Sequence, residues 1–127
     1  MTIELYYLIL FALLIVATIF TQQLSSLLSE GLVPLFGSRE GIKFTGLTGR
    51  LERSITNSAI SMAIILPPIV AIQVTESSTP SGILAMQIFL GARLLYVLSY
   101  AFSIFGLRSA AWVTGMLCTL WLFTLLL

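Results

Sequence analysis

The sequence predicts an all-α integral membrane protein that folds as a four-helix bundle. Hydrophobic residues make up 58% of the 127 residues and charged residues only 9%, and the mean hydropathy is +1.08. A composition this apolar is not typical of a small water-soluble domain. The chain offers four windows of the roughly 20 apolar residues that cross a bilayer, with little sequence left over. We therefore expect a single four-span membrane domain over residues 1–127.

The first two spans are predicted over residues 3–28 and 53–74. The first has an apolar block over residues 5–20 and no basic segment before it, which indicates a retained span and not a cleaved signal peptide. The second contains Pro67 and Pro68, which remove backbone hydrogen-bond donors. Neighbouring helices tolerate such a defect in a membrane, so we expect a kink there and not a break.

The last two spans are predicted over residues 82–105 and 110–127. Trp112 and Trp121 lie near opposite ends of the fourth span, which is typical of anchoring at the two membrane interfaces. Cys118 lies in the middle of the same span. We expect this cysteine to have a packing role.

Basic residues gather on one side of the predicted topology. The loop after the first span and the turn before the fourth hold Arg39, Lys43, Arg50, Arg53 and Arg108. The N-terminus carries Glu4, and the turn after the second span carries Glu76. Short cytoplasmic loops are enriched in Lys and Arg, so both termini are expected outside the cytoplasm.

Composition also excludes several function classes. With no histidine and one cysteine, the chain cannot assemble the usual soft-metal sites or a Cys-His or Ser-His nucleophile. A net charge of +1 gives no basis for nucleic-acid binding. A four-span drug exporter would need a carboxylate inside the membrane, whereas the acidic residues here lie in loops or at span ends.

Polar residues at helical spacing mark one face of the second span. Arg50, Arg53 and Asn57 follow one another at steps of three and four residues. Arginine can clamp a carboxylate with two parallel hydrogen bonds, and an Asn amide both donates and accepts, so this face suits a small anionic ligand. The alternative is that the arginines reach lipid phosphates at the membrane boundary, which is slightly favoured for Arg50. For Arg53 and Asn57, ligand contact and hydrogen bonding between helices are about equally supported.

The third span carries a second stripe, built on an arginine near its centre. A guanidinium at that depth is costly unless it faces protein or water, so Arg93 is expected to point inward. Tyr96 and Tyr100 follow on the same face, and the stripe leads to Arg108. The alternative is an ion pair for Arg93 and interfacial tyrosines, but the nearest acidic candidate, Glu52, lies at the end of another helix. A functional stripe is therefore favoured.

These residues resemble the MAPEG superfamily, the membrane-associated proteins in eicosanoid and glutathione metabolism. The resemblance rests on Arg53-x-x-x-Asn57, Ala92-Arg93-x-x-Tyr96-x-x-x-Tyr100 and Arg108-Ser109. It covers nearly the whole chain, including size, span number and loop lengths. Similarity to the bacterial branch is carried by Ser38-Arg39-Glu40 and by Thr48-Gly49-Arg50-Leu51-Glu52-Arg53.

The resemblance implies a homotrimer in a bacterial inner membrane that binds glutathione between subunits near the cytoplasmic side. Glutathione would be the cosubstrate, with no metal, and the acceptor would be a lipophilic electrophile or hydroperoxide. The implied catalytic residue is Arg108, which would stabilise the thiolate. By position, the implied glutathione-binding residues are Arg53, Asn57, Arg93, Tyr96 and Tyr100.

Two positions depart from the family pattern. Ile60 stands where the motif carries a glutamate, and the spacing from Tyr100 to Arg108 is one residue longer than in the eicosanoid branch. An isoleucine cannot pair with an arginine or receive the ammonium group of glutathione. A glutathione-dependent transferase or peroxidase and a noncatalytic membrane scaffold or lipid-binding protein therefore both stay open, as does binding of a different thiol.

Overall fold

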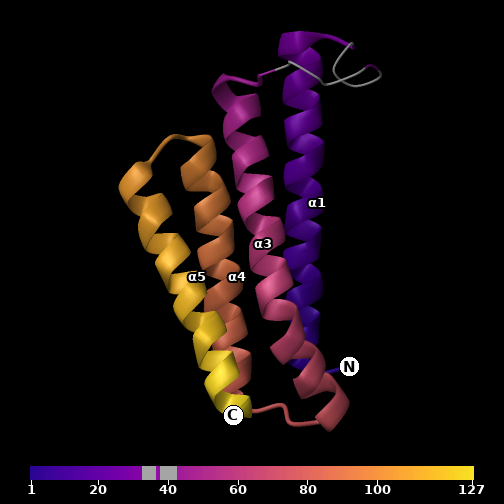
Figure 1. Ribbon diagram of the computed structural model, residues 1–127, viewed down its shortest axis with the longest axis vertical. Coiled ribbons are helices and arrows are strands. Elements are labelled where there is room, and N and C mark those ends of the chain that lie inside the picture. The colour runs from indigo at the N-terminus through magenta and orange to yellow at the C-terminus, as the bar shows by residue number, and fades with distance from the viewer. Residues whose placement is uncertain (33–36, 38–42) are drawn as a thin grey trace.

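The computed structural model describes residues 1–32, 37 and 43–127 of the chain. These residues form helices and no strands (Figure 1): α1 (Ile3–Glu30), α3 (Gly46–Thr75), α4 (Pro80–Ala101) and α5 (Phe105–Leu126). Each of the four is long and apolar enough to cross a membrane. The predicted all-α, four-helix membrane bundle is confirmed.

The helices differ in length at one end of the bundle. Figure 1 shows α1 and α3 rising beyond the turn that joins α4 to α5, whereas both termini lie at the opposite end. The helix α3 begins at Gly46, well before the predicted second span, so Arg50 and Arg53 lie on helical backbone. This early start sets both arginines beside the end of α4.

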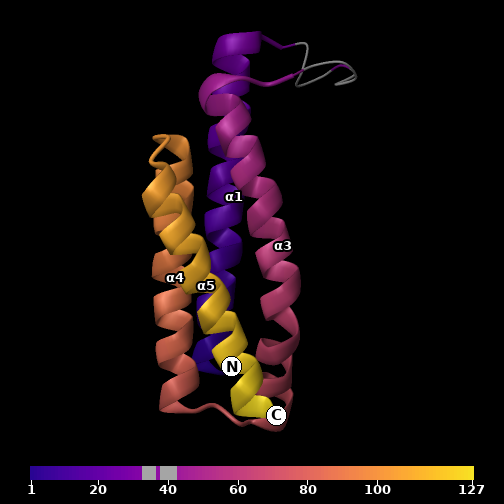
Figure 2. The ribbon, with the colours of Figure 1, turned by 60° about the vertical axis from the view of Figure 1, so that its left-hand side comes forward.

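The two prolines do not break α3. Pro67 and Pro68 lie inside a helix that continues to Thr75. Figure 2 shows the helix changing direction in its lower half, where the prolines lie. The bend fits the loss of two backbone donors within a helix that its neighbours support.

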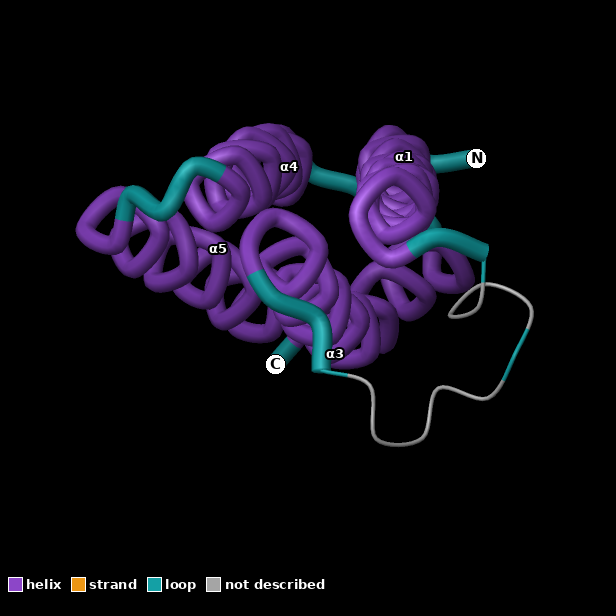
Figure 3. The backbone as a smooth tube through the Cα atoms, turned by 90° about the horizontal axis from the view of Figure 1, so that it is seen from above, coloured by secondary structure: helices purple, strands orange, loops and turns teal. Residues whose placement is uncertain are grey.

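One core joins all four helices. Seen from above in Figure 3, they surround a common centre, and α3 and α4 each contact the other three. Phe11 and Phe89 meet edge to face at a centroid separation of 5.0 Å, a favourable geometry for aromatic pairs. Cys118 is buried in the same cluster, where it packs among apolar side chains.

A buried carboxylate fastens the first helix to the third span. The Glu4 side chain is 0% exposed. The Ser78 hydroxyl donates to its two oxygens at 3.0 and 2.7 Å, and the backbone N–H of Thr79 donates to it at 3.3 Å. Thr79 is the N-cap residue of α4, so the carboxylate lies at the end of the helix that favours negative charge.

The turn between α4 and α5 has the geometry of a Schellman C-cap. Ile104 N–H donates to the Ser99 carbonyl at 2.8 Å, and Ser103 N–H donates to the Tyr100 carbonyl at 3.2 Å. Ser103 takes the left-handed position, with φ of 60°, where glycine is usual. This turn fixes the spacing between Tyr100 on α4 and Arg108 on α5.

Candidate functional site

Arg93 is buried in the bundle and has neutral partners. The residue is 1% exposed. Its Nη2 donates to Asn57 Oδ1 at 3.0 Å and to Ser58 Oγ at 2.9 Å, both on α3. Its guanidinium carbon lies 4.3 Å from the centroid of the Tyr96 ring. Two dipoles and an aromatic face therefore stabilise this charge, as expected for an arginine facing protein.

Two buried polar atoms near these contacts have no hydrogen-bond partner in the described part of the chain. They are Nε of Arg93 and Oγ of Ser54, which lies one helical turn before Ser58. Buried donors are normally paired with protein, water or a ligand. These two atoms can therefore still form hydrogen bonds to a ligand or to water.

A second cluster surrounds Tyr100, closer to the α4–α5 turn. Arg53 Nε donates to the Tyr100 hydroxyl at 3.2 Å. The guanidinium carbon of Arg108 lies 4.8 Å from the Tyr100 ring centroid. The rings of Tyr96 and Tyr100 are 5.6 Å apart, which links this cluster to the one around Arg93. The six residues singled out from the sequence therefore form one continuous set of contacts within a single chain.

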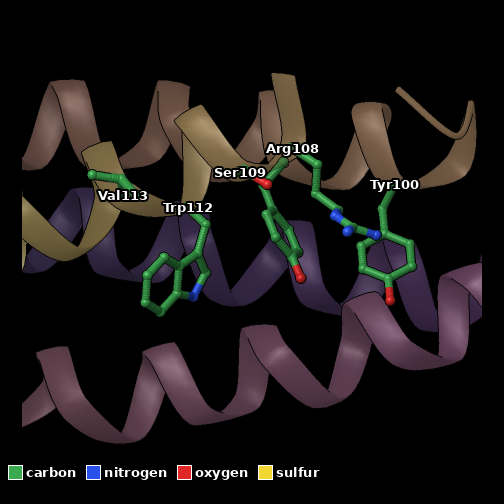
Figure 4. Close-up of a pocket in the computed structure, with 6 residues that line it drawn as sticks. Tyr100, Arg108, Ser109, Trp112 and Val113 are labelled. Atoms are coloured by element: carbon green, nitrogen blue, oxygen red, sulfur yellow. The ribbon is translucent and has the colours of Figure 1, made fainter. Parts of the chain in front are cut away.

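Two cavities share this second cluster. The larger, about 500 Å³, is lined by Tyr96, Tyr100, Arg108, Ser109, Trp112 and Val113. Figure 4 shows the Arg108 side chain reaching over Tyr100, with Trp112 further along α5. The smaller, about 280 Å³, is lined by Gly46, Arg50, Arg53, Tyr100, Ser103, Phe105 and Arg108. Tyr100 and Arg108 line both cavities.

The region is positively charged without internal compensation. Within the described part of the chain, Arg50, Arg53, Arg93 and Arg108 form no ion pair with a carboxylate. Their partners are carbonyl, amide, hydroxyl and aromatic groups. A cluster of cations with free donors favours an anionic ligand.

A comparison with family models identifies the family of this chain. A family model described as MAPEG family matches residues 3–127. The chain belongs to the MAPEG family. No significant match was found among curated proteins or among solved structures. The matched range includes all four helices and every residue that lines the two cavities.

Membership in the MAPEG family, together with four helices that can each span a bilayer, makes this an integral multi-pass membrane protein. The assignment to the bacterial branch depended in part on Ser38, Arg39 and Glu40. These three residues lie outside the described residues.

At the motif position of the MAPEG glutamate, this chain exposes an apolar side chain. Ile60 is 55% exposed and lines neither of the two cavities. Asn57 and Ser58 take the place of an acidic partner for Arg93. The isoleucine therefore does not fill the cavities in this MAPEG protein.

Three residues have a larger part in the geometry than the sequence indicated. Ser58 accepts from Arg93, although only its neighbour Asn57 stood out in the MAPEG motif. Trp112, expected as an interfacial anchor, lines the larger cavity one turn beyond Arg108. Arg50, expected to reach lipid phosphates, donates through Nε to the Ala101 carbonyl at 3.0 Å. The spacing of four residues from Arg108 to Trp112 is the sequence signal that could have found the tryptophan.

Proposed function

We propose that this MAPEG protein is a glutathione-dependent transferase or peroxidase that acts on lipophilic electrophiles. In this proposal it works as a homotrimer in a bacterial inner membrane, with the arginine-rich end of the bundle on the cytoplasmic side. The observation that carries it is the convergence of Arg53 and Arg108 on Tyr100, with no carboxylate of the described residues paired to either arginine. Glutathione brings two carboxylates and a thiol, which suit such a site.

The proposed roles follow the two clusters. The outer pair, Arg53 and Tyr100, would hold a carboxylate of the tripeptide near the membrane surface. The inner group of Asn57, Arg93 and Tyr96 has donors and acceptors that support the amide groups of the same ligand. Arg108 lines both cavities, so it is suited to stabilise negative charge where cosubstrate and acceptor meet.

In the proposed reaction, the thiol proton of glutathione leaves to water and the Arg108 guanidinium stabilises the remaining thiolate. The thiolate sulfur forms a bond to the electrophilic atom of the acceptor, and the electron pair of the broken bond stays with the leaving group or the reduced acceptor atom. Trp112 and Val113 give the larger cavity an apolar wall, which supports entry of the acceptor from lipid. The protein contributes positioning and charge stabilisation but no covalent nucleophile.

A noncatalytic scaffold or lipid-binding protein is the second candidate. The exposed Ile60 at the position of the motif glutamate favours it, since a carboxylate for the ammonium group of glutathione is missing there. The two candidates differ in whether a thiol is bound and ionised.

The test is calorimetric titration of the detergent-solubilised protein with glutathione, combined with the ultraviolet absorbance of the thiolate. We expect saturable binding below millimolar glutathione and a thiolate signal in the wild type. Arg108→Ala should keep binding but lose the thiolate signal and about 100-fold or more in turnover. Lys43→Ala, which removes an exposed charge outside both cavities, should behave as the wild type. Absence of binding at millimolar glutathione would contradict the proposal and favour the scaffold.

A further inference from the structure

We propose that the smaller cavity is a binding site for the phosphate headgroup of an anionic phospholipid. Three arginines from two helices surround it: Arg50 and Arg53 from α3, and Arg108 from α5. Arg50 is central to the inference, because it is not needed for the proposed thiol chemistry. Arg53 and Arg108 are shared with the proposed glutathione site, so the lipid phosphate and glutathione would compete for this cavity. The ligand class is a phosphodiester that carries a negative charge at the membrane surface.

The arginines keep donors available for a phosphate. Arg50 uses Nε to bind the Ala101 carbonyl, and Arg53 uses Nε to bind the Tyr100 hydroxyl. The structure gives the terminal nitrogens of these two guanidinium groups no hydrogen-bond partner among the described residues. The single bond at each Nε holds the guanidinium in place. Two arginines held in this way, with terminal N–H groups free, suit the oxygens of a phosphate.

The start of α3 adds to the positive potential of the cavity. Gly46, the first residue of the helix, lines the cavity, and the N-cap residue Thr45 makes no side-chain hydrogen bond to the helix. The first N–H groups of a helix lack internal partners and attract anions. These groups reinforce the arginines on the same wall.

The cavity lies where phospholipid headgroups are expected. It is built at the end of α4 and the start of α5, beside the turn shown in Figure 1. Basic residues at the end of a membrane helix are attracted to anionic lipids. A free phosphate ion would offer the same oxygens to the arginines, but it has no acyl chain that could contact an apolar surface next to the site.

Such an apolar surface is present. A groove of about 330 Å³ is lined mostly by apolar side chains of α1, α3 and α4, including Leu47, Leu51, Ala101 and Phe102. Ala101 lines this groove, and its carbonyl accepts the Arg50 hydrogen bond, so the Arg50–Ala101 contact joins the walls of groove and cavity. A lipid with its phosphate on Arg50 and an acyl chain in the groove would match both surfaces.

The experiment measures lipid binding to the detergent-solubilised protein by native mass spectrometry, in the absence of glutathione. Phosphatidylglycerol and phosphatidylcholine with the same acyl chains are compared, and glycerol phosphate is used as a headgroup without chains. We expect phosphatidylglycerol to bind at least about fivefold more tightly than phosphatidylcholine, since each basic residue near the surface contributes on that scale. Arg50→Gln should weaken phosphatidylglycerol about fivefold. It should weaken phosphatidylcholine less, because the ammonium group of that lipid already balances its phosphate charge.

Lys43→Gln is the matched control, since it removes one positive charge shortly before the start of α3 from a residue that does not line the cavity. It should leave both affinities unchanged. If Arg50→Gln does not fold, the proposal is tested with Arg50→Lys and with the affinities of the wild type for the two lipids. Arg50→Lys should keep the preference for phosphatidylglycerol, because it keeps the charge. Equal affinity of the wild type for the two lipids, or equal losses in Arg50→Gln and Lys43→Gln, would overturn the proposal. Displacement of phosphatidylglycerol by an equal concentration of glycerol phosphate would overturn the lipid as the source of the phosphate.

Discussion

Arg93 shows how a single charge is held inside this bundle. Its hydrogen bonds go to an amide and a hydroxyl, and its guanidinium carbon also lies 5.7 Å from the Phe11 ring centroid. Removing a neutral acceptor from a buried cation leaves part of its charge unsolvated, which is more costly than the net value of the lost bond. The stability of the protein should therefore depend on Asn57 and Ser58.

We predict that Asn57→Leu lowers the free energy of unfolding by about 1–3 kcal/mol, because Arg93 loses the Oδ1 acceptor at 3.0 Å. The measurement is denaturant unfolding in mixed micelles. Thr56→Leu, at an exposed position on the same turn, is the control and should cause no such loss. Equal losses in the two variants would show that Arg93 does not depend on this acceptor.

The contacts among the candidate site residues were largely predictable at the level of helix faces. Steps of three and four residues placed Arg53 with Asn57, and Arg93 with Tyr96, on common faces. They could not show that Arg93 reaches across to Ser58, because the rotation of one helix against another depends on packing along its whole length. The same limit hid Trp112, since a tryptophan near a span end is also typical of an interfacial anchor.

At the scale of elements, the α4–α5 turn controls the distance between the two helices that form the larger cavity. Ser103 adopts a φ of 60° without being glycine, which is unfavourable for an L-residue. The hydrogen bonds of the turn hold it in this conformation. A glycine at position 103 would adopt this φ without the steric cost of a Cβ, so the substitution should stabilise the folded state.

We predict that Ser103→Gly raises the free energy of unfolding by about 0.5–1 kcal/mol, after the greater freedom of glycine in the unfolded chain is taken into account. Ser109→Gly, on the helical backbone of α5, should instead destabilise by up to about 1 kcal/mol. Thermal unfolding in detergent would compare the two. A loss of stability in Ser103→Gly would contradict the role given to the positive φ.

Element lengths were less predictable than element number. Hydropathy found four spans, but α3 starts at Gly46, outside the predicted range 53–74. Its first turns carry Arg50 and Glu52, which lower the hydropathy of any window that includes them. A helix that extends out of the bilayer keeps its backbone hydrogen bonds without an apolar surface, so a hydropathy criterion cannot locate its end.

At the scale of the whole molecule, Glu4 ties the start of α1 to the start of α4. The nearby Thr2 N–H donates to Gln73 Oε1 at 2.7 Å, which ties the first residues of the chain to the far end of α3. A Cβ added at Gly82 would lie 2.8 Å from Glu4 Oε1, so a larger residue there would require the carboxylate to shift. The start of α1 is thus joined to α4 through Glu4 and to α3 through Thr2.

We predict that Glu4→Ala lowers the free energy of unfolding by about 1–3 kcal/mol, since the Thr79 N–H and the Ser78 hydroxyl lose their acceptor. Glu52→Ala, which removes an exposed carboxylate from α3, should have little effect. Chemical denaturation of both variants in the same detergent provides the comparison. Similar stability of both variants would mean that Glu4 does not hold the helices together.

The unequal helix lengths have a consequence for access. The 22 residues of α4 and of α5 extend about 33 Å, close to the hydrocarbon thickness, whereas the 28 residues of α1 and the 30 of α3 extend about 42 and 45 Å. The helices α1 and α3 therefore extend about 10 Å beyond the turn between α4 and α5, and Tyr100 and Arg108 lie near that turn. At this turn a water-soluble molecule can approach from the aqueous side, and a lipid-soluble molecule can approach from within the bilayer. The two can therefore meet while each stays in its own phase.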